Sequence, residues 1–261
     1  MESDASSTPA MPEDILKEYR ARVGHFSKRF HGEEWHTPKG RAIREVVFGM
    51  NDGLITTIGF VMGLAASIKE SNLVLLAGIM AMFAGAISMF FGAYISTKSQ
   101  SEYFDRELRR EAREIEEVPE KEIAEMQEIF AEKGFTKSEA DILVKRVTSD
   151  KQHWLEFMAK EELGIVPETF DNPLKVGATM GISFLIGALP PLLPFAFTHR
   201  APLAAKVAGI VSLVALFFIG AGRSKVTKLN WVRNGLEIMI IGILAGSAGL
   251  LFGHFSSLIL K

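Results

Sequence analysis

An aspartate lies inside an apolar stretch that is long enough to enter a membrane. Asp52 belongs to the run EVVFGMNDGLITTIGFVMG, which begins at Glu45 and ends at Gly63. A carboxylate at the centre of a transmembrane helix costs roughly 2.5 to 3.5 kcal/mol on insertion scales, and such residues face a bundle interior or an ion path. The nearby polar residues that could partner it, such as Asn51 and Thr56, are neutral. We therefore predict that Asp52 coordinates an ion or exchanges a proton in a transporter.

A methionine in the next apolar run could serve the same ion. Counted from the same end of the two runs, Met89 lies at a depth comparable with that of Asp52. A thioether is a soft ligand, and beside a carboxylate it favours a borderline transition metal over Mg²⁺ or Ca²⁺. Methionine is also an ordinary filler of apolar helices. Spacing alone leaves both interpretations of Met89 open.

Three pairs of potential metal ligands recur at helical spacing in the polar segment 98–172. These pairs are Glu111 and Glu114, Glu122 and Glu125, and Met158 and Glu162. Residues three or four apart project from one helix face. Helices that direct such pairs inward can build a multi-metal site, as four-helix carboxylate proteins do. The segment has 20 acidic and 12 basic residues, so these spacings also arise by chance, and on pattern alone a solvated acidic face is the simpler interpretation.

The composition indicates a membrane protein without thiol chemistry. Of the 261 residues 48% are hydrophobic and 23% are charged, and the two classes occupy different parts of the chain. The chain has no cysteine, which excludes disulfides, cysteine-ligated zinc and iron–sulfur clusters. Any metal site must therefore use Asp, Glu, His, Met or backbone oxygen.

Five apolar runs are each long enough to cross a bilayer, for which about 20 residues suffice. They cover residues 46–68, 73–97, 174–198, 203–222 and 236–260. Lysine and arginine concentrate before the first run, after the second, and between the fourth and fifth. Since basic residues mark the cytosolic side of a membrane protein, we expect the N-terminus and the long insertion in the cytosol and the C-terminus on the opposite side.

The expected fold is an all-α integral membrane protein with five transmembrane helices and a helical cytosolic domain inserted between helices 2 and 3. The expected segments are a cytosolic N-terminal segment, 1–45; transmembrane helices 1 and 2, 46–97; an acidic, metal-binding cytosolic domain, 98–172; and transmembrane helices 3 to 5, 173–261. Within the first segment, apolar positions at helical spacing over residues 13–30 predict an amphipathic helix on an anionic membrane face. A helix packed on another part of the protein would show the same pattern.

Local signals refine this expectation at three places. The second span is predicted to continue as one helix up to Pro119, where the next helix starts. The third span is expected to kink or stop at Pro190, the first of three closely spaced prolines. Ser138 is expected to cap a later helix of the insertion.

The order of these features resembles a known family. A basic N-terminus, a span with FGMNDGLITTIGF, a second with GAISMFFGAYIS, a glutamate-rich insertion and three further spans are similar to the plant vacuolar iron transporters. The resemblance covers nearly the whole chain from about Arg44 onwards. It implies transport of Fe²⁺ from cytosol to vacuole in exchange for protons, by a homodimer in the vacuolar membrane whose ion path lies at the subunit interface.

The resemblance also assigns roles to particular residues. It places Asp52 and Met89 on the ion path and Glu45 at its cytosolic mouth. It implies that the cytosolic domain binds metal through a set of carboxylates and one methionine: Glu102, Glu111, Glu114, Glu122, Glu125, Met158 and Glu162. Metal preference varies within the family, so Mn²⁺, Co²⁺ and Zn²⁺ are further candidate substrates, and no prosthetic group is expected.

Two other functional classes remain open from the sequence. A membrane-anchored carboxylate-type iron oxidase would use the acidic pairs, but it needs Glu-x-x-His ligands, and the insertion has one histidine, His153, followed by Glu156 in the reverse order. A metal-sensing scaffold would leave Asp52 unexplained. No GxxxxGK[ST] loop occurs, which argues against ATP-driven transport, and we expect no nucleic-acid partner.

Overall fold

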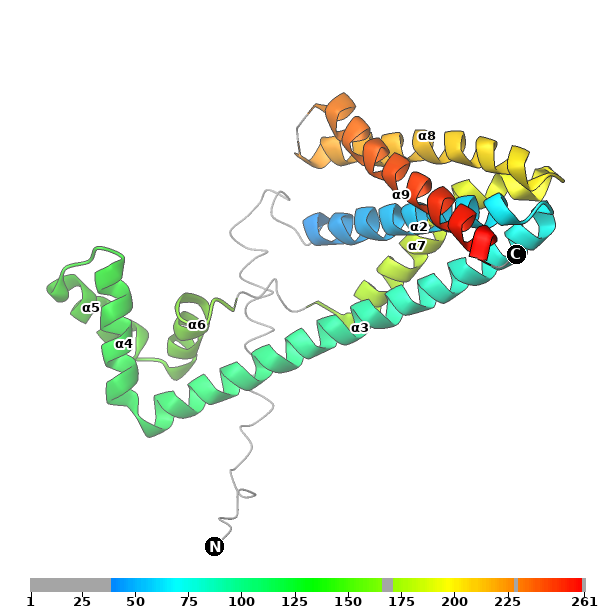
Figure 1. The fold of residues 1–261 in the computed structure, drawn as a ribbon. Helices are drawn as coiled ribbons and strands as arrows, with labels where there is room; N and C mark the ends of the chain where they lie inside the picture. Colours follow the sequence, from blue (N-terminus) through cyan, green and yellow to red (C-terminus); the bar gives the residue numbers. More distant parts are fainter. Residues whose placement is uncertain (1–38, 166–170, 228–229, 260–261) are drawn as a thin grey trace, which may run out of the picture. The chain divides into compact units, whose positions relative to one another are not determined.

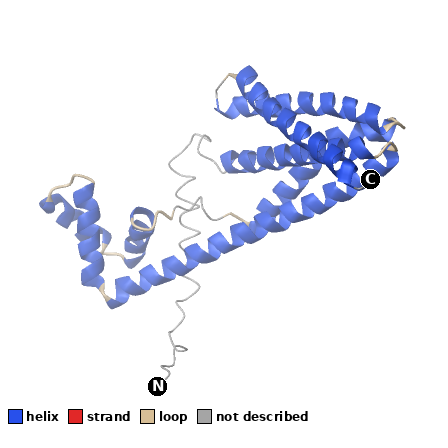
Figure 2. Cartoon of the chain, viewed as in Figure 1, coloured by secondary structure: helices blue, strands red, loops and turns tan. Residues whose placement is uncertain are grey.

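The structure is a computed structural model that describes residues 39–165, 171–227 and 230–259, and its regular elements there are all helices (Figures 1 and 2). The helices are α2 (Lys39–Ser67), α3 (Ser71–Glu117), α4 (Pro119–Glu132), α5 (Lys137–Val147), α6 (Lys151–Glu161), α7 (Pro173–Phe197), α8 (Ala201–Thr227) and α9 (Trp231–Ile259). The amphipathic helix predicted over residues 13–30 lies outside the described residues.

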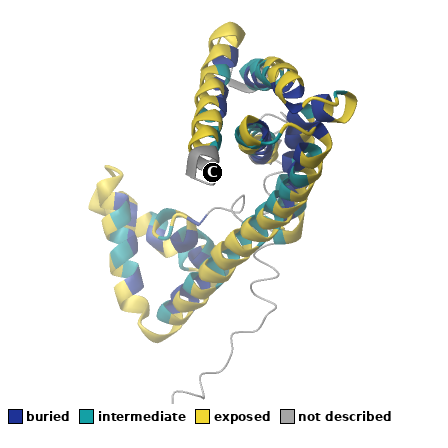
Figure 3. Ribbon diagram, turned by 45° about the vertical axis from the view of Figure 1, so that its right-hand side comes forward, coloured by how far each residue is buried: buried dark blue, intermediate teal, exposed yellow. Residues whose placement is uncertain are grey.

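The chain divides into two compact units. One, here called the five-helix unit, comprises residues 37–97 and 172–261, and the other, the acidic unit, includes residues 98–171. Helix α3 contributes to both, because it continues without interruption from Ser71 to Glu117. The prediction that the second span extends as one helix to the proline that starts the next is therefore confirmed. In each unit, buried positions follow one side of the helices and exposed positions the other (Figure 3).

All five predicted spans correspond to helices that are long and apolar enough to cross a membrane. These stretches are Ala42–Ser67 in α2, the apolar part of α3, Pro173–Phe197 in α7, Ala201–Ser224 in α8 and Trp231–Phe255 in α9. An α-helix suits this environment because it satisfies its backbone hydrogen bonds within one segment. The prediction of five transmembrane helices in an all-α protein is confirmed at this level.

The third span does not stop at its prolines. Helix α7 continues through Pro190, Pro191 and Pro194 and ends at Phe197. A proline removes one backbone donor from the helix, but neighbouring helices can compensate within a membrane bundle. Pro191 and Pro194 are both buried against such neighbours, so packing holds the helix together where local sequence alone favours an end.

Glycines bring the backbone of α2 against two other helices. A Cβ atom at Gly53 would overlap the carbonyl of Phe184 on α7, and one at Gly63 would lie 2.8 Å from the carbonyl oxygen of Gly249 on α9. Gly249 and Gly253 of α9 in turn contact the carbonyls of Gly59 and Gly63. Small residues permit such close approach of membrane helices. The small residues of the first span therefore serve its contacts with α7 and α9.

The acidic unit has an apolar core of its own. Met126 and Phe130 of α4 pack with Ala140 of α5 and with Trp154 and Met158 of α6. Burial of these side chains away from water is what holds short helices of this kind together. The core fixes the ends of α3, α4 and α6 relative to one another within this unit.

The cap of α5 differs from the prediction. Thr136, not Ser138, is the N-cap residue, and its backbone N–H donates to the carboxylate of Glu139 at 2.8 Å. This reciprocal arrangement is a capping box, which satisfies backbone donors that the first helical turn leaves free. Ser138 falls inside that first turn. The helix begins at Thr136 and not at the later serine because the Thr-x-x-Glu pattern supplies two capping hydrogen bonds, whereas Ser138 alone would supply one.

Candidate functional site

Three glutamates from three helices meet in the acidic unit. Glu111 lies on α3, Glu122 on α4, and Glu162 is the C-cap residue of α6. Each contributes one carboxylate oxygen to a group in which all the chosen oxygens lie within 4.8 Å of one another. We call these three residues the carboxylate cluster. Such a group of hard oxygen ligands can hold a divalent cation.

Two members of the cluster are buried. Glu111 is 2% exposed and Glu122 is fully buried, whereas Glu162 is open to solvent. Among the described residues, one oxygen of Glu111 and both oxygens of Glu122 are buried, and the only donor available to them is a proton shared between these two carboxyl groups. Buried carboxylate oxygens that lack donors are costly in a folded protein. The arrangement is therefore suited to accept either protons or a cation, with Glu162 at the side from which an ion can enter.

Burial and mutual repulsion raise the pKa values of all three carboxyl groups. For Glu111, burial is the main cause and the charges of Glu162 and Glu122 add to it, which raises its pKa to about 8. Burial also raises the pKa of Glu122. Glu162 is exposed as a residue, but its carboxyl group is partly covered by the protein, which raises its pKa as well. For both groups the charge of Glu125 is the next cause. A cation placed among these groups would offset the repulsion and displace the proton.

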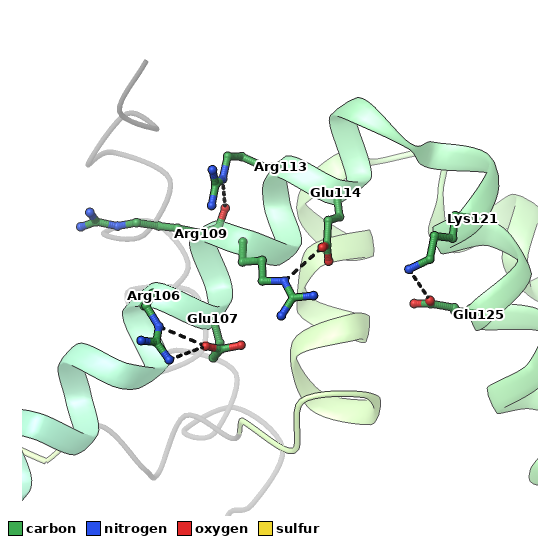
Figure 4. Close-up of polar contacts among 8 residues, drawn as sticks. Arg106, Glu107, Arg109, Arg113, Glu114, Lys121 and Glu125 are labelled. Atoms are coloured by element: carbon green, nitrogen blue, oxygen red, sulfur yellow. Dashed lines mark hydrogen bonds and ion pairs between the residues drawn. The ribbon is translucent and has the colours of Figure 1, made fainter. Parts of the chain in front are cut away.

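Glu114 and Glu125 border the cluster and are held by basic side chains. The carboxylate of Glu114 lies 3.0 Å from the guanidinium of Arg110, and that of Glu125 lies 2.9 Å from the ammonium group of Lys121 (Figure 4). Both glutamates are about a third exposed. Their charges act on Glu162 and raise its pKa. To bind an ion together with the cluster, either residue would first leave its ion pair, which at such exposure costs about 1 kcal/mol or less.

Met158 is fully buried one helical turn before Glu162. Its side chain belongs to the apolar core that also contains Ala112, which follows Glu111, and Met126. Met126 is a feature that our sequence analysis missed: it is also fully buried, and it follows Glu122 by four residues on α4. The signal was present, because Glu122 and Met126 have the same spacing as Met158 and Glu162. Two helices thus combine a cluster carboxylate with a buried thioether.

Glu102 lies apart from the cluster on α3. Its side chain is 65% exposed and lies 3.7 Å from the ammonium group of Lys98. It precedes Glu111 by nine residues, which is two and a half turns of an α-helix. The structure therefore does not bring Glu102 together with the three clustered carboxylates, and its predicted metal-binding role stays a prediction.

The membrane carboxylate occupies a different setting. Asp52 lies within α2, is half-buried, and forms a hydrogen bond with the hydroxyl of Thr56 one turn later. Glu45 is buried seven residues earlier and so lies on the same helix face. Within the described part of the chain, neither acid joins a group of three carboxylate or imidazole ligands. Gly49 and Gly53, which flank this face, fix α2 against α7.

Met89 lies half-buried on α3. It packs against the apolar cluster that includes Met82 and Ala86 of the same helix and Phe184 of α7. Contacts of this kind are what a methionine that fills an apolar gap would make. The contacts of Met89 within this chain do not test its predicted place on the ion path, which stays a prediction.

The one histidine of the insertion does not approach the cluster. His153 is 60% exposed on α6, and its Nδ1 atom lies 3.6 Å from the carboxylate of Asp150, which caps the same helix. A diiron oxidase site of the four-helix type would need histidine beside the carboxylates. The carboxylate cluster lacks that ligand.

The family model and the similar proteins all belong to one family. The model of the VIT family matches residues 43–254 of the chain. Vacuolar iron transporter 1 of Arabidopsis thaliana is 34% identical over 218 residues, which cover 84% of this chain and 87% of that protein. Vacuolar iron transporter 1 of Oryza sativa subsp. japonica is 36% identical over 218 residues, 84% of this chain and 86% of that protein. The vacuolar iron transporter of Plasmodium falciparum is 31% identical over 251 residues, 92% of this chain and 91% of that protein.

Proposed function

Because the chain belongs to the VIT family, we propose that it moves Fe²⁺ from the cytosol across the vacuolar membrane into the vacuole. The proteins to which it is about a third identical over most of its length are named as vacuolar iron transporters. Its five long apolar helices suit a multi-pass membrane protein. The chain is accordingly a transporter and not an enzyme, and the iron oxidase interpretation is set aside.

The carboxylate cluster is the main support for a first step in which the protein captures Fe²⁺. Glu111, Glu122 and Glu162 place oxygens within 4.8 Å of one another, and an incoming Fe²⁺ would neutralise their repulsion. Glu114 and Glu125 would complete the oxygen ligands from the border, and Met158 would bias the site towards transition metals because its sulfur is a soft ligand. The same ligands would admit Mn²⁺, Co²⁺ or Zn²⁺ as competing substrates. Glu102 is exposed and paired with Lys98 outside the cluster, so we give it no ligand role in this step.

Asp52 is the residue that we assign to the membrane step. A carboxylate in a membrane span is expensive and is kept for ion paths and proton relays. Met89 would supply a soft ligand on the same path, and Glu45 would receive the ion at the cytosolic mouth. When Asp52 takes up a proton from an acidic vacuole, it loses its negative charge and its affinity for the ion. Proton entry would then drive metal release, which makes the protein a proton-coupled antiporter.

The proposed sidedness follows from the basic residues that flank the spans. It places the N-terminus and the acidic unit in the cytosol, where the cluster meets its substrate, and the C-terminus in the vacuolar lumen. We further propose a homodimer, with Asp52 and Met89 of both subunits along one path. An apolar stripe on α3 would then face lipid or the second subunit; it includes Met80, Phe83 and Ile87, each more than half exposed.

Uptake of metal into liposomes tests the proposal. Purified full-length protein is reconstituted, a pH gradient with an acidic interior is imposed, and Fe²⁺ entry is measured under reducing conditions, with Mn²⁺, Co²⁺ and Zn²⁺ as competitors. We expect gradient-dependent Fe²⁺ entry by the parent protein. Asp52→Asn should abolish entry, because the variant keeps the side-chain shape but cannot carry the charge or the exchanged proton.

Binding measurements on the same proteins separate the two steps. Asp52→Asn should bind Fe²⁺ at the carboxylate cluster as the parent does, whereas Glu122→Gln should lose binding there. Glu102→Gln is the matched control, since Glu102 is an exposed, ion-paired glutamate outside the cluster. Full proton-dependent uptake by Asp52→Asn would refute the membrane step. Failure of the parent to move any metal while it still binds Fe²⁺ would refute transport and favour a metal-sensing scaffold.

A further inference from the structure

A cavity of about 140 Å³ lies inside the five-helix unit, between α2, α8 and α9. Its walls include Ile58 and Met62 from α2, Gly209 from α8 and Gly246 from α9. The glycines leave room where side chains would otherwise fill the space between the helices. Neither Asp52 nor any member of the carboxylate cluster lines it, so the cavity is separate from the residues that we assign to metal capture and transport.

One polar group in this cavity lacks a partner. Ser212 of α8 lines the cavity, is 1% exposed, and its hydroxyl oxygen has no hydrogen-bond partner among the described residues. Leaving a buried hydroxyl without a partner is unfavourable. The other lining residues are apolar or glycine, apart from Ser247 of α9. A ligand with one hydrogen-bond acceptor would therefore gain a hydrogen bond from the Ser212 hydroxyl, which a purely apolar ligand cannot form.

The cavity is reached from the side of the bundle. Ile243 and Leu250 of α9 line it and are 45% and 40% exposed. Both lie within the stretch of α9 that is apolar enough to cross a membrane. A molecule that enters here would come from the membrane phase and not from water.

We propose that this cavity binds a small, membrane-dissolved molecule that is largely apolar and carries one alcohol or carbonyl oxygen, with Ser212 as the hydrogen-bond donor. Size supports this class, because an apolar cavity of about 150 Å³ is known to hold one benzene ring. A water cluster fits less well, since each water needs two to four polar partners and the walls offer two hydroxyl groups. A lipid acyl chain would fill the space but leave Ser212 unpaired.

Such a ligand would act on α2. It would touch α2 on one side and α8 and α9 on the other, and so favour the arrangement of these helices seen here. Because α2 carries Asp52, a bound molecule is expected to slow any step that requires α2 to move against α8. Binding itself does not depend on the transport proposal and can be tested without it.

Photolabelling of the purified full-length protein tests the binding. The probe is a short alcohol that carries a diazirine, and the labelled residues are mapped by mass spectrometry, with benzyl alcohol and toluene as competitors. We expect labelling at the residues that line the cavity, with saturable competition by benzyl alcohol. Gly209→Val should reduce this labelling at least about tenfold, because a Cβ atom at Gly209 meets open space and the added methyl groups would occupy the cavity.

Two further variants make the result specific. Gly222→Val is the matched control. Gly222 lies on the same helix as Gly209, and a Cβ atom there also meets open space, but Gly222 does not line the cavity. Labelling of this variant should therefore stay within about twofold of the parent. Ser212→Ala should weaken competition by benzyl alcohol about two- to tenfold, which corresponds to one net hydrogen bond, and leave competition by toluene unchanged. Labelling spread evenly over lipid-facing residues would overturn the proposal, and so would no labelling at the cavity, as expected if a second subunit covers it. Equal effects of Ser212→Ala on both competitors would overturn the proposal that Ser212 donates a hydrogen bond to the ligand.

Discussion

Replacing Glu111 by glutamine is expected to change how the stability of the acidic unit depends on pH. The buried carboxyl group of Glu111 has its pKa raised from 4.5 to about 8 in the folded protein. Between these two pH values the folded state holds a proton that the unfolded state has released. The resulting stabilisation is therefore complete below pH 4.5 and is lost as the pH rises through about 8.

The pKa shift sets an upper limit to this effect. At about 1.36 kcal/mol for each pKa unit, the shift of Glu111 corresponds to roughly 5 kcal/mol. The true change is expected to be smaller, about 2 to 4 kcal/mol between pH 5 and pH 8. Part of the Glu111 shift comes from the charges of Glu122 and Glu162, and these groups also have raised pKa values, so they are partly neutral within this range. Glutamine has nearly the same size and is neutral at every pH. The variant should thus be the more stable of the two at pH 8 without metal, and its stability should vary less with pH.

Trp154 offers a local reporter for the measurement. It is buried in the core of the acidic unit and is one of three tryptophans in the chain. In a Trp35→Phe, Trp231→Phe background of the full-length protein, unfolding in urea is followed by Trp154 fluorescence between pH 5 and pH 8 with a metal chelator present. Glu102→Gln is the control and should leave the pH dependence unchanged.

Addition of Fe²⁺ extends the test. At pH 8 the ion should stabilise the parent protein, because it replaces the lost proton among the carboxylates, and it should stabilise Glu111→Gln much less. The reasoning would be refuted if the parent became more stable from pH 5 to pH 8, or if Glu111→Gln kept the full pH dependence of the parent. Either result would mean that Glu111 does not hold the proton.

Three further predictions concern single contacts. Gly53→Ala should lower the free energy of unfolding of the five-helix unit by about 2 to 3 kcal/mol, because the added Cβ atom would overlap the α7 backbone. Gly92→Ala is the control, since a Cβ atom there meets open space, and it should change this free energy by less than about 1 kcal/mol. Both are measured by thermal unfolding in detergent. Calorimetric titration should show Fe²⁺ affinity reduced at least about tenfold by Glu122→Gln, or about 1.4 kcal/mol, and unchanged by Glu102→Gln. Thr136→Ala should destabilise the acidic unit by about 1 kcal/mol, because it removes the N-cap of α5, and an unchanged urea midpoint of Trp154 fluorescence would contradict this.

The sequence predicted the helices well because their signals are local. Apolar runs of about 20 residues marked all five spans, and the uninterrupted helical pattern after Thr97 indicated that α3 would continue to its end at Glu117. The third span was predicted to kink or stop at its prolines, and the alternative of a stop was wrong, because neighbouring helices override local preference. Pro190 would end an isolated helix, but α7 continues because its prolines are packed against other helices.

The candidate site was predicted only in part for the same reason. Spacing showed only that Glu111 and Glu122 could face inward, and it favoured a solvated acidic face. It also could not show that Glu162 joins them from a third helix, since that depends on how α6 packs. Nor could spacing separate Glu102 from the buried glutamates, because its exposure and its pairing with Lys98 depend on the fold. Met126 was overlooked although it has the same four-residue spacing to Glu122 that Met158 has to Glu162.

The glycine contacts between α2 and α9 restrict how Asp52 can move. Gly59, Gly63, Gly249 and Gly253 bring main chain against main chain, so no layer of side chains is available there to absorb a shift by changing rotamers. Gly53 makes a similar contact with α7. Any displacement of Asp52 relative to α3 should then be a rigid-body motion that takes α2, α7 and α9 along together. The unit of movement during transport would be this block of three helices, with Asp52 as a fixed point on its surface.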